Sequence, residues 1–401
     1  MKEFFKKGHS IIVLGTGGVG KTTIAAALGM GGALGGLRTA AITIDPAQRL
    51  RDALGMRTLG GTPTRIESRR LRRAGIDADL PLYAMVLDVR GRWDALVERL
   101  VADPIARAAI RHNRFYRSLA GQFAGSDAYA ALEQLYDLHE NGGFDLEIVD
   151  TPPAAQAFEF LQAPSQLVRL LDSDVTRLLA AGGAIGGGFA LRIAGSAARF
   201  VARELESFAG VEMLSSIADF FTSAAGASTG LLDRFRKADA LLHSSHVHFV
   251  LVTTAERDRL IHACEMVREI RTRGLTLGAI VINRFLDEES WEELRLKHRG
   301  AAIKALDAIV GDSDDDASLA AITAWLRSHA RSMRTEVTRV EEFVRGLPKA
   351  VRVLAVPALL DDAVDLAALN RIAGYLSLDL PPSIDRRTGR AASGRPRGAA
   401  A

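Results

Sequence analysis

The chain has 401 residues, of which 48% are apolar and 25% charged, and this composition is that of a globular protein. The formal net charge is +3, but a group of arginines lies close to the C-terminal end: Arg386, Arg387, Arg390, Arg395 and Arg397. The rest of the chain is therefore nearly neutral. A basic face for nucleic acid is excluded by this distribution, and we expect no nucleic-acid partner.

Cysteine usage and hydropathy set further limits. Cys264 is the only cysteine, so neither an intramolecular disulfide nor a site of several thiolates can form within one chain. The first ten residues are basic but lead directly into the apolar run SIIVLG, without a signal-peptide core. The longest apolar stretch, residues 178–191, is too short and too glycine-rich for a membrane span. We expect a cytoplasmic protein with no stable membrane anchor.

Short apolar runs alternate with helical periodicity along the chain. This alternation predicts an α/β fold with a mostly parallel sheet and helices on both faces. The predicted strands are SIIVLG, TAAITID, LYAMVLD, LEIVD, HFVLVTT, TLGAIVIN and VRVLAVP. The residues at their carboxyl ends are Gly15, Asp45, Asp88, Asp150, Thr254, Asn283 and Pro357. Open α/β sheets bind ligands beyond these ends, so the site is expected there.

The first strand leads into GTGGVGKTT, residues 15–23, which fits the P-loop pattern. Backbone N–H groups from Gly17 to Lys21 would surround phosphates at a helix N-terminus, where the helix dipole favours negative charge. Lys21 would neutralise the β- and γ-phosphates, and the Thr22 hydroxyl would bind Mg²⁺ directly. The predicted contacts to ATP from this loop are Gly15, Gly17, Gly18, Val19, Gly20, Lys21, Thr22 and Thr23.

The same loop also fits a second phosphate-binding pattern. Gly15, Gly17 and Gly20 match the dinucleotide fingerprint G-x-G-x-x-G, which would make the chain a nicotinamide-dependent oxidoreductase. A dehydrogenase has no use for the Lys-Thr-Thr that ends the motif. We therefore favour the P-loop and keep the oxidoreductase as an alternative.

Two carboxylates follow predicted strands downstream of the loop. Asp150, in LEIVDTPP, fits the Walker-B position, where an acid after an apolar strand holds Mg²⁺ through water. Asp45, in TIDPAQRL, fits a catalytic position, where a carboxylate beside the γ-phosphate orients the attacking water. Each could also be a helix N-cap, a common place for Asp. With a P-loop upstream, we favour the functional interpretation of both.

Two segments interrupt the alternation and are predicted to be helical insertions. We expect a P-loop ATPase core in three parts, at 1–91, 247–286 and 347–380, the last of which contains the adenine loop. A mostly helical subdomain at 92–246 is interrupted at 146–153 by a core strand and switch II, and a second helical insertion occupies 287–346. The chain ends in a disordered basic tail at 381–401.

The motifs GTGGVGKTT, IDPAQRL, VDTPP, VINR and VPALLDDAVDL, in this order, resemble those of the ArsA/GET family. This family contains the arsenite-pump ATPase and the targeting factor for tail-anchored proteins, which are deviant-Walker-A ATPases. The resemblance implies that Asp45 belongs to switch I and that Asp150 opens switch II. It also implies that Asn283 reads adenine, beside the wall formed by Pro357 and its neighbours, and that a helical lobe opens and closes with nucleotide state in a dimer.

The sequence departs from this family at points that bear on partners. The three thiols of the pump's metalloid site and the zinc-binding cysteine pair of the targeting factor are absent. The lysine that follows the first glycine of the deviant motif is replaced by Thr16. We therefore expect either a homodimer, with slow hydrolysis or with another basic residue such as Arg49 as substitute, or a heterodimer with a paralogue that carries the missing lysine.

The stretch from 182 to 232 is apolar and rich in small residues and phenylalanine. It fits either a groove for a hydrophobic or membrane-protein client or helices that pack their own core. The sequence thus predicts a magnesium-dependent ATPase of the ArsA/GET type. A positioning switch of the ParA/MinD kind is the other alternative, although the chain shows no amphipathic membrane helix for it. The histidines of HSSHVH are interpreted as core or surface residues rather than as a metal site.

Overall fold

The computed structural model describes residues 5–44, 49–76, 79–121, 126–152, 220, 228–286, 316–349, 351–359 and 365–378. Asp45, the apolar stretch from 182 to 232 except Phe220 and residues 228–232, and the basic tail lie outside the described residues.

An eight-stranded sheet forms the centre of the described chain, with the strand order β3-β4-β2-β5-β1-β6-β7-β8. The strands are β1 (His9–Gly15), β2 (Thr39–Thr43), β3 (Thr64–Arg65), β4 (Leu82–Val86), β5 (Leu146–Asp150), β6 (Val247–Thr253), β7 (Leu277–Ile282) and β8 (Arg352–Ala355). All neighbouring strands pair in parallel except β3, which runs antiparallel to β4 at the edge. β1 therefore lies between β5 and β6, and its carboxyl end is flanked by both of theirs.

The strands are apolar on both sides because each face of the sheet carries its own core. Successive residues of β1 alternate between them: Ile11 and Val13 belong to one core, and Ile12 and Leu14 to the other. All four are fully buried. This is the burial expected of a parallel sheet covered by helices, and it is the reason the sequence shows continuous apolar runs.

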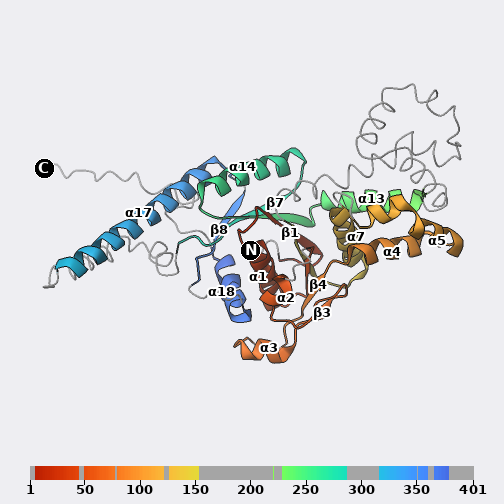
Figure 1. Ribbon diagram of the computed structural model, residues 1–401, viewed down its shortest axis with the longest axis horizontal. Helices are drawn as coiled ribbons and strands as arrows, with labels where there is room; N and C mark the ends of the chain where they lie inside the picture. Colours follow the sequence, from red (N-terminus) through yellow and green to blue (C-terminus); the bar gives the residue numbers. More distant parts are fainter. Residues whose placement is uncertain are drawn as a thin grey trace, which may run out of the picture.

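The described helices are α1 (Lys21–Leu34), α2 (Arg49–Ala53), α3 (Ser68–Arg73), α4 (Val89–Leu100), α5 (Pro104–His112), α6 (Arg114–Leu119), α7 (Ser126–Asn141), α13 (Ser228–Leu242), α14 (Arg257–Thr272), α17 (Asp316–Gly346) and α18 (Leu366–Leu376). α1, α2, α3 and α18 contribute to the core on one face, and the other helices to the core on the opposite face. Figure 1 shows α4, α5, α7 and α13 gathered at one end of the molecule, and α17 projecting at the other.

The predicted fold class is confirmed: the sheet is mostly parallel and helices cover both faces. Each of the seven predicted strands is present, with ends shifted by no more than a few residues. The sequence analysis missed β3, because two exposed residues carry no apolar pattern. The proposed division into segments stays a prediction, and the described part of each insertion is helical.

A network of charged side chains joins α4, α7 and α13. Arg92 of α4 donates to Glu133 at 3.1 Å and to Asp137 at 2.8 Å, and both acids lie on α7. Arg234 of α13 pairs with the same two acids. Burial acts to raise the pKa of Asp137, but hydrogen bonds from Arg99 and Arg92 outweigh it and hold that pKa well below its usual value. We call α4, α5, α6, α7 and α13 the helical lobe. The network ties three of these helices together.

A group of histidines lies at the amino-terminal edge of the sheet, opposite the nucleotide motifs. The Nδ1 atom of His9 on β1 and the Nε2 atom of His248 on β6 are 3.0 Å apart, and the rings are stacked. His246 contacts the ring of His9 edge-on. His139 lies near His246 and pairs with the buried carboxylate of Glu147. The structure therefore adds His9 and His139 to the histidines noted in the sequence.

These histidines make stability depend on pH. Burial, followed by neighbouring positive groups, lowers the pKa values of His9 and His248, whereas the hydrogen bond that His139 donates to Glu147 raises the pKa of His139. A lowered pKa means that the unfolded chain takes up the proton more readily, so the stability contributed by His9 and His248 falls as the pH drops through the ordinary histidine pKa. The raised pKa of His139 acts in the opposite direction.

We therefore expect the contribution of His248 to lower the melting temperature of the wild type between about pH 7.5 and about pH 5.5. His248→Gln should show a smaller fall over this interval, because one proton-linked difference is removed. Thermal unfolding followed by circular dichroism at both pH values measures the difference in melting temperature. The matched control is His262→Gln at an exposed position of α14. An equal fall in His248→Gln and wild type would contradict the prediction.

Candidate functional site

The loop between β1 and α1 has a backbone that only glycine allows at two positions. Gly20 adopts a left-handed conformation with φ +88°, and a Cβ there would lie 2.3 Å from Nδ2 of Asn283. At Gly15 a Cβ would lie 2.4 Å from the carbonyl oxygen of Val252 on β6. The loop is therefore pressed against the carboxyl ends of β6 and β7. These contacts explain the spacing of the glycines in the motif.

Helix α1 begins at Lys21, directly after the loop, and its first turn contains no acidic residue. Its N-terminal N–H groups and dipole therefore remain available to a negative ligand. The Lys21 side chain is buried, and its Nζ donates to the backbone carbonyl of Thr16 at 3.1 Å. Lys21 is thus folded back across the loop. Thr22 and Thr23 follow in the first turn and are partly exposed.

Asp150 ends β5, the strand beside β1, and is 1% exposed. The Thr43 hydroxyl at the end of β2 donates to its Oδ2 at 3.1 Å, and the N–H of Ile44 donates to its backbone oxygen at 3.1 Å. Thr151, which directly follows β5, donates its hydroxyl to the carbonyl of Val13 in β1 at 2.7 Å. The carboxylate is therefore held beside the end of β1, and the chain reaches Asp45 directly after Ile44.

Asn283 follows β7 and is buried. Its Nδ2 donates to the carbonyl of Val19 at 2.8 Å, so this side chain holds the loop from outside. Pro357, which follows β8, is buried as well. The two strand ends are joined where Phe285 donates its N–H to Val356 at 2.9 Å. The structure therefore brings Asn283 and Pro357 to the same edge of the sheet as the loop, as predicted from their positions after parallel strands.

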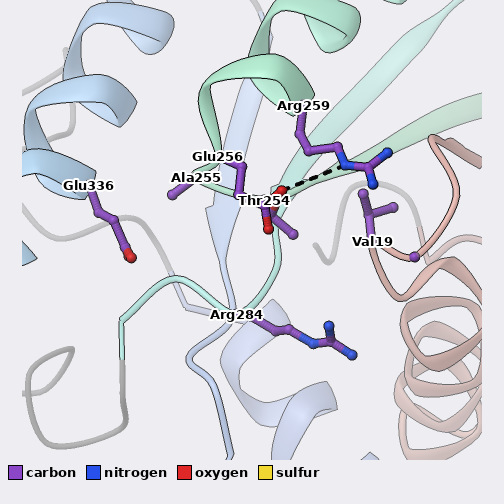
Figure 2. A pocket seen from close by; sticks show the side chains of 8 residues that line it. Val19, Thr254, Ala255, Glu256, Arg259, Arg284 and Glu336 are labelled. Atoms are coloured by element: carbon purple, nitrogen blue, oxygen red, sulfur yellow. Dashed lines mark ion pairs between the residues drawn. The ribbon is translucent and has the colours of Figure 1, made fainter. Parts of the chain in front are cut away.

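A small pocket of about 120 Å³ opens beside the loop. Its lining comes from the loop, from the start of α14, from the end of β7 and from α17: Gly18, Val19, Thr254, Ala255, Glu256, Arg259, Arg284 and Glu336. Figure 2 shows the guanidinium groups of Arg259 and Arg284 on the side of the pocket where Val19 lies, and Glu336 on the other side. The sequence analysis missed both arginines, although Arg284 directly follows Asn283 in the motif VINR.

Comparison with known families decides what this site belongs to. The family model of the ArsA ATPases, described as anion-transporting ATPases, matches residues 9–315. The chain belongs to this family. The ArsA resemblance drawn from the motifs is thereby confirmed, and the P-loop interpretation of residues 15–23 is favoured over the dinucleotide fingerprint.

Several curated relatives are similar to this ArsA-family chain over shorter or longer parts. An uncharacterized protein of Streptomyces coelicolor is 33% identical over 163 residues, 41% of this chain and 39% of that protein. The ATPase ARSA1 of Chlamydomonas reinhardtii is 27% identical over 347 residues, 81% of this chain and 40% of that protein. The ATPase asna-1 of Caenorhabditis elegans is 22% identical over 293 residues, 69% of this chain and 74% of that protein. The chain thus spans about two fifths of the first two of these relatives.

Two features expected of other protein classes are absent from the residues that the structure describes. None of the helices in those ranges has the length and hydropathy needed to cross a bilayer. The same residues contain no group of three or more histidine, cysteine or acidic side chains placed to hold a metal ion. The histidines of HSSHVH therefore do not gather into a metal site of that kind within the part of the chain that the structure describes.

Proposed function

We propose that this member of the ArsA family is a magnesium-dependent ATPase. The observation that carries the proposal is the loop from Gly15 to Gly20, which leads to the unobstructed N-terminus of α1 with Lys21 folded across it. The loop's N–H groups and Lys21 bind the phosphates, and the Thr22 hydroxyl and the Asp150 carboxylate supply oxygen ligands of the kind Mg²⁺ prefers. The family match supports this function.

The residues of the site have separate tasks in this proposal. Thr22 would hold Mg²⁺ directly and Asp150 would hold it through water, and the ion would supply positive charge to the phosphates. Lys21 stabilises the phosphoryl group during transfer, and Asp45 orients the attacking water. Asn283 holds the loop through Val19 and, with Pro357, lies where the base would be bound. These roles rest on the sequence motifs and on the shared edge of the sheet.

The proposal is tested by melting the protein with ATP–Mg²⁺, with NAD and with neither. Saturating ATP at about 100 times its Kd should stabilise the folded state by about 2.7 kcal/mol, and NAD should not. Release of phosphate from ATP should require Mg²⁺. Stabilisation by NAD without any response to ATP would support the oxidoreductase alternative instead.

The proposal includes coupling between the nucleotide and the helical lobe. Helix α7 leads into β5, which carries Asp150, and the network around Glu133 and Asp137 joins α7 to α4 and α13. A change at the end of β5 on hydrolysis would therefore act on three joined helices together. The lobe opens and closes with nucleotide state in this proposal and binds a hydrophobic or membrane-protein client.

The partner proposed for this chain follows from Thr16. The resemblance implies that a lysine at this position reaches the partner's nucleotide across a face-to-face dimer, and Thr16 is uncharged, short and buried. We therefore propose pairing with a paralogue that carries the lysine, and the homodimer is the other outcome. The chain alone should hydrolyse ATP slowly.

Thr16→Lys should raise the turnover of the purified chain at least about 10-fold if it pairs with itself, since arginines acting across an interface supply about 10³ to 10⁵ in rate. Phosphate release at several protein concentrations, with sedimentation of the same samples, measures this. Thr16→Gln is the control for side-chain length without charge. Fast turnover in the wild-type homodimer that Thr16→Lys leaves unchanged would remove the reason for a paralogue.

A further inference from the structure

The pocket beside the P-loop contains an arginine whose backbone is strained. Arg284 has φ +53°, in the left-handed region that side chains other than glycine rarely adopt. Its neighbours Asn283 and Phe285 are buried, and hydrogen bonds to Thr253 and Val356 fix the backbone on either side of it. The surrounding structure therefore imposes this conformation. Such strain is concentrated at binding and catalytic sites, where it directs a side chain.

The Arg284 side chain lies in the pocket and is not used to stabilise the fold. It is exposed, and it makes no hydrogen bond or ion pair with any other residue that the structure describes. Arg259, by contrast, pairs with Glu256 at 3.7 Å. Asn283, directly before Arg284, donates to the carbonyl of Val19 in the loop. Figure 2 shows the Arg284 side chain directed toward the side of the pocket where Val19 lies.

A second feature of the pocket points to a polar ligand. Thr254 lines it and is only 8% exposed, yet within the described ranges its hydroxyl has no hydrogen-bond partner. A buried hydroxyl without a partner costs free energy unless a ligand completes it. The N-terminus of α14 begins at the same place, but Glu256 at its N-cap and Asp258 in its first turn already supply negative charge there. Thr254 and Arg284, rather than this helix, therefore point to a ligand.

We propose that Arg284 is a nucleotide-binding residue, and that its guanidinium contacts the β- and γ-phosphates of the nucleotide held by the P-loop. This inference rests on the proposed function. The guanidinium supplies positive charge beside a loop whose sequence carries only one lysine, Lys21. A planar guanidinium offers two parallel N–H donors that match a pair of phosphate oxygens, whereas a lysine acts as a point charge without this fixed geometry.

The test is the equilibrium Kd of ATP, ADP and AMP for wild type, Arg284→Gln, Arg284→Lys and Arg284→Gly. Loss of charge-assisted hydrogen bonds should weaken the binding of ATP about 10- to 100-fold in Arg284→Gln and Arg284→Gly, and less in Arg284→Lys. The affinity for AMP should change little in all three variants. Because Gly accepts positive φ, Arg284→Gly should keep the melting temperature of the free protein. Arg257→Gln, an exposed arginine of α14 outside the pocket, is the matched control.

The outcomes separate this inference from the function on which it rests. If wild type binds ATP, Lys21→Ala does not, and Arg284→Gln binds as wild type does, then only the role of Arg284 is overturned. If AMP loses as much affinity as ATP, the contact is to a part of the nucleotide that AMP shares with ATP and not to the β- and γ-phosphates, which also overturns the inference. If wild type does not bind ATP, or Lys21→Ala binds it as wild type does, the proposed function itself fails.

Discussion

Lys21→Ala is expected to abolish the rise in melting temperature that ATP–Mg²⁺ produces in the wild type. Lys21 is the first residue of α1, is buried, and is held over the loop by its hydrogen bond to Thr16. With ATP bound, its ammonium would exchange this carbonyl for phosphate oxygens. Each charge-assisted hydrogen bond contributes about 1.5–3 kcal/mol, so the loss of two should weaken the binding of ATP by at least about 100-fold.

The melting temperature is measured with and without ATP–Mg²⁺ for both proteins. At an ATP concentration that saturates the wild type, the variant's site is mostly empty, so the stabilisation disappears. Lys237→Ala removes an exposed lysine from α13 and serves as the matched control. Without ATP the variant should melt close to the wild type, because the Lys21 side chain that it lacks donates to a backbone carbonyl of the same loop. An ATP response equal to that of the wild type would show that the loop does not bind the nucleotide.

The strands could be predicted from the sequence because the parallel sheet is buried on both faces. Its parallel strands then consist mainly of apolar residues on both sides, as in β1 and β6. The edge of the sheet at which the site lies could be predicted in the same way, because parallel strands place their carboxyl ends together and polar residues gather there. Asp150, Asn283 and Pro357 were found in this way, although their roles stay predictions.

The contacts that hold the site could not be predicted in this way. Asn283 bonds to Val19 across 264 positions of the sequence, and no periodicity reports a partner so far away. The positive φ of Arg284 arises from hydrogen bonds on both sides of it, so the residue itself gives no local signal. His9 and His248 meet because β1 and β6 are neighbours, which depends on strand order rather than on either sequence segment.

Asp45→Asn is expected to separate hydrolysis from binding. Asp45 itself lies outside the described residues, but the residues before it approach Asp150: Thr43 donates to the carboxylate, and Ile44 to the backbone oxygen. The chain is thus delivered to the edge where the phosphates would lie. A carboxylate that orients the attacking water and accepts its proton acts in the transition state and adds little to ground-state binding.

The turnover of Asp45→Asn should therefore fall by about 10²- to 10⁴-fold, the usual contribution of a positioned acid or base. Its Kd for ATP should stay within about threefold of the wild type, because asparagine keeps the size of the side chain and removes a negative charge that phosphates would repel. Phosphate release at saturating ATP and the Kd for ATP are measured on the same preparation. Asp79→Asn, at an exposed position beside β4, is the control. If Kd and turnover worsened by equal factors, Asp45 would be a binding or folding residue, and the water would have to be oriented by another group.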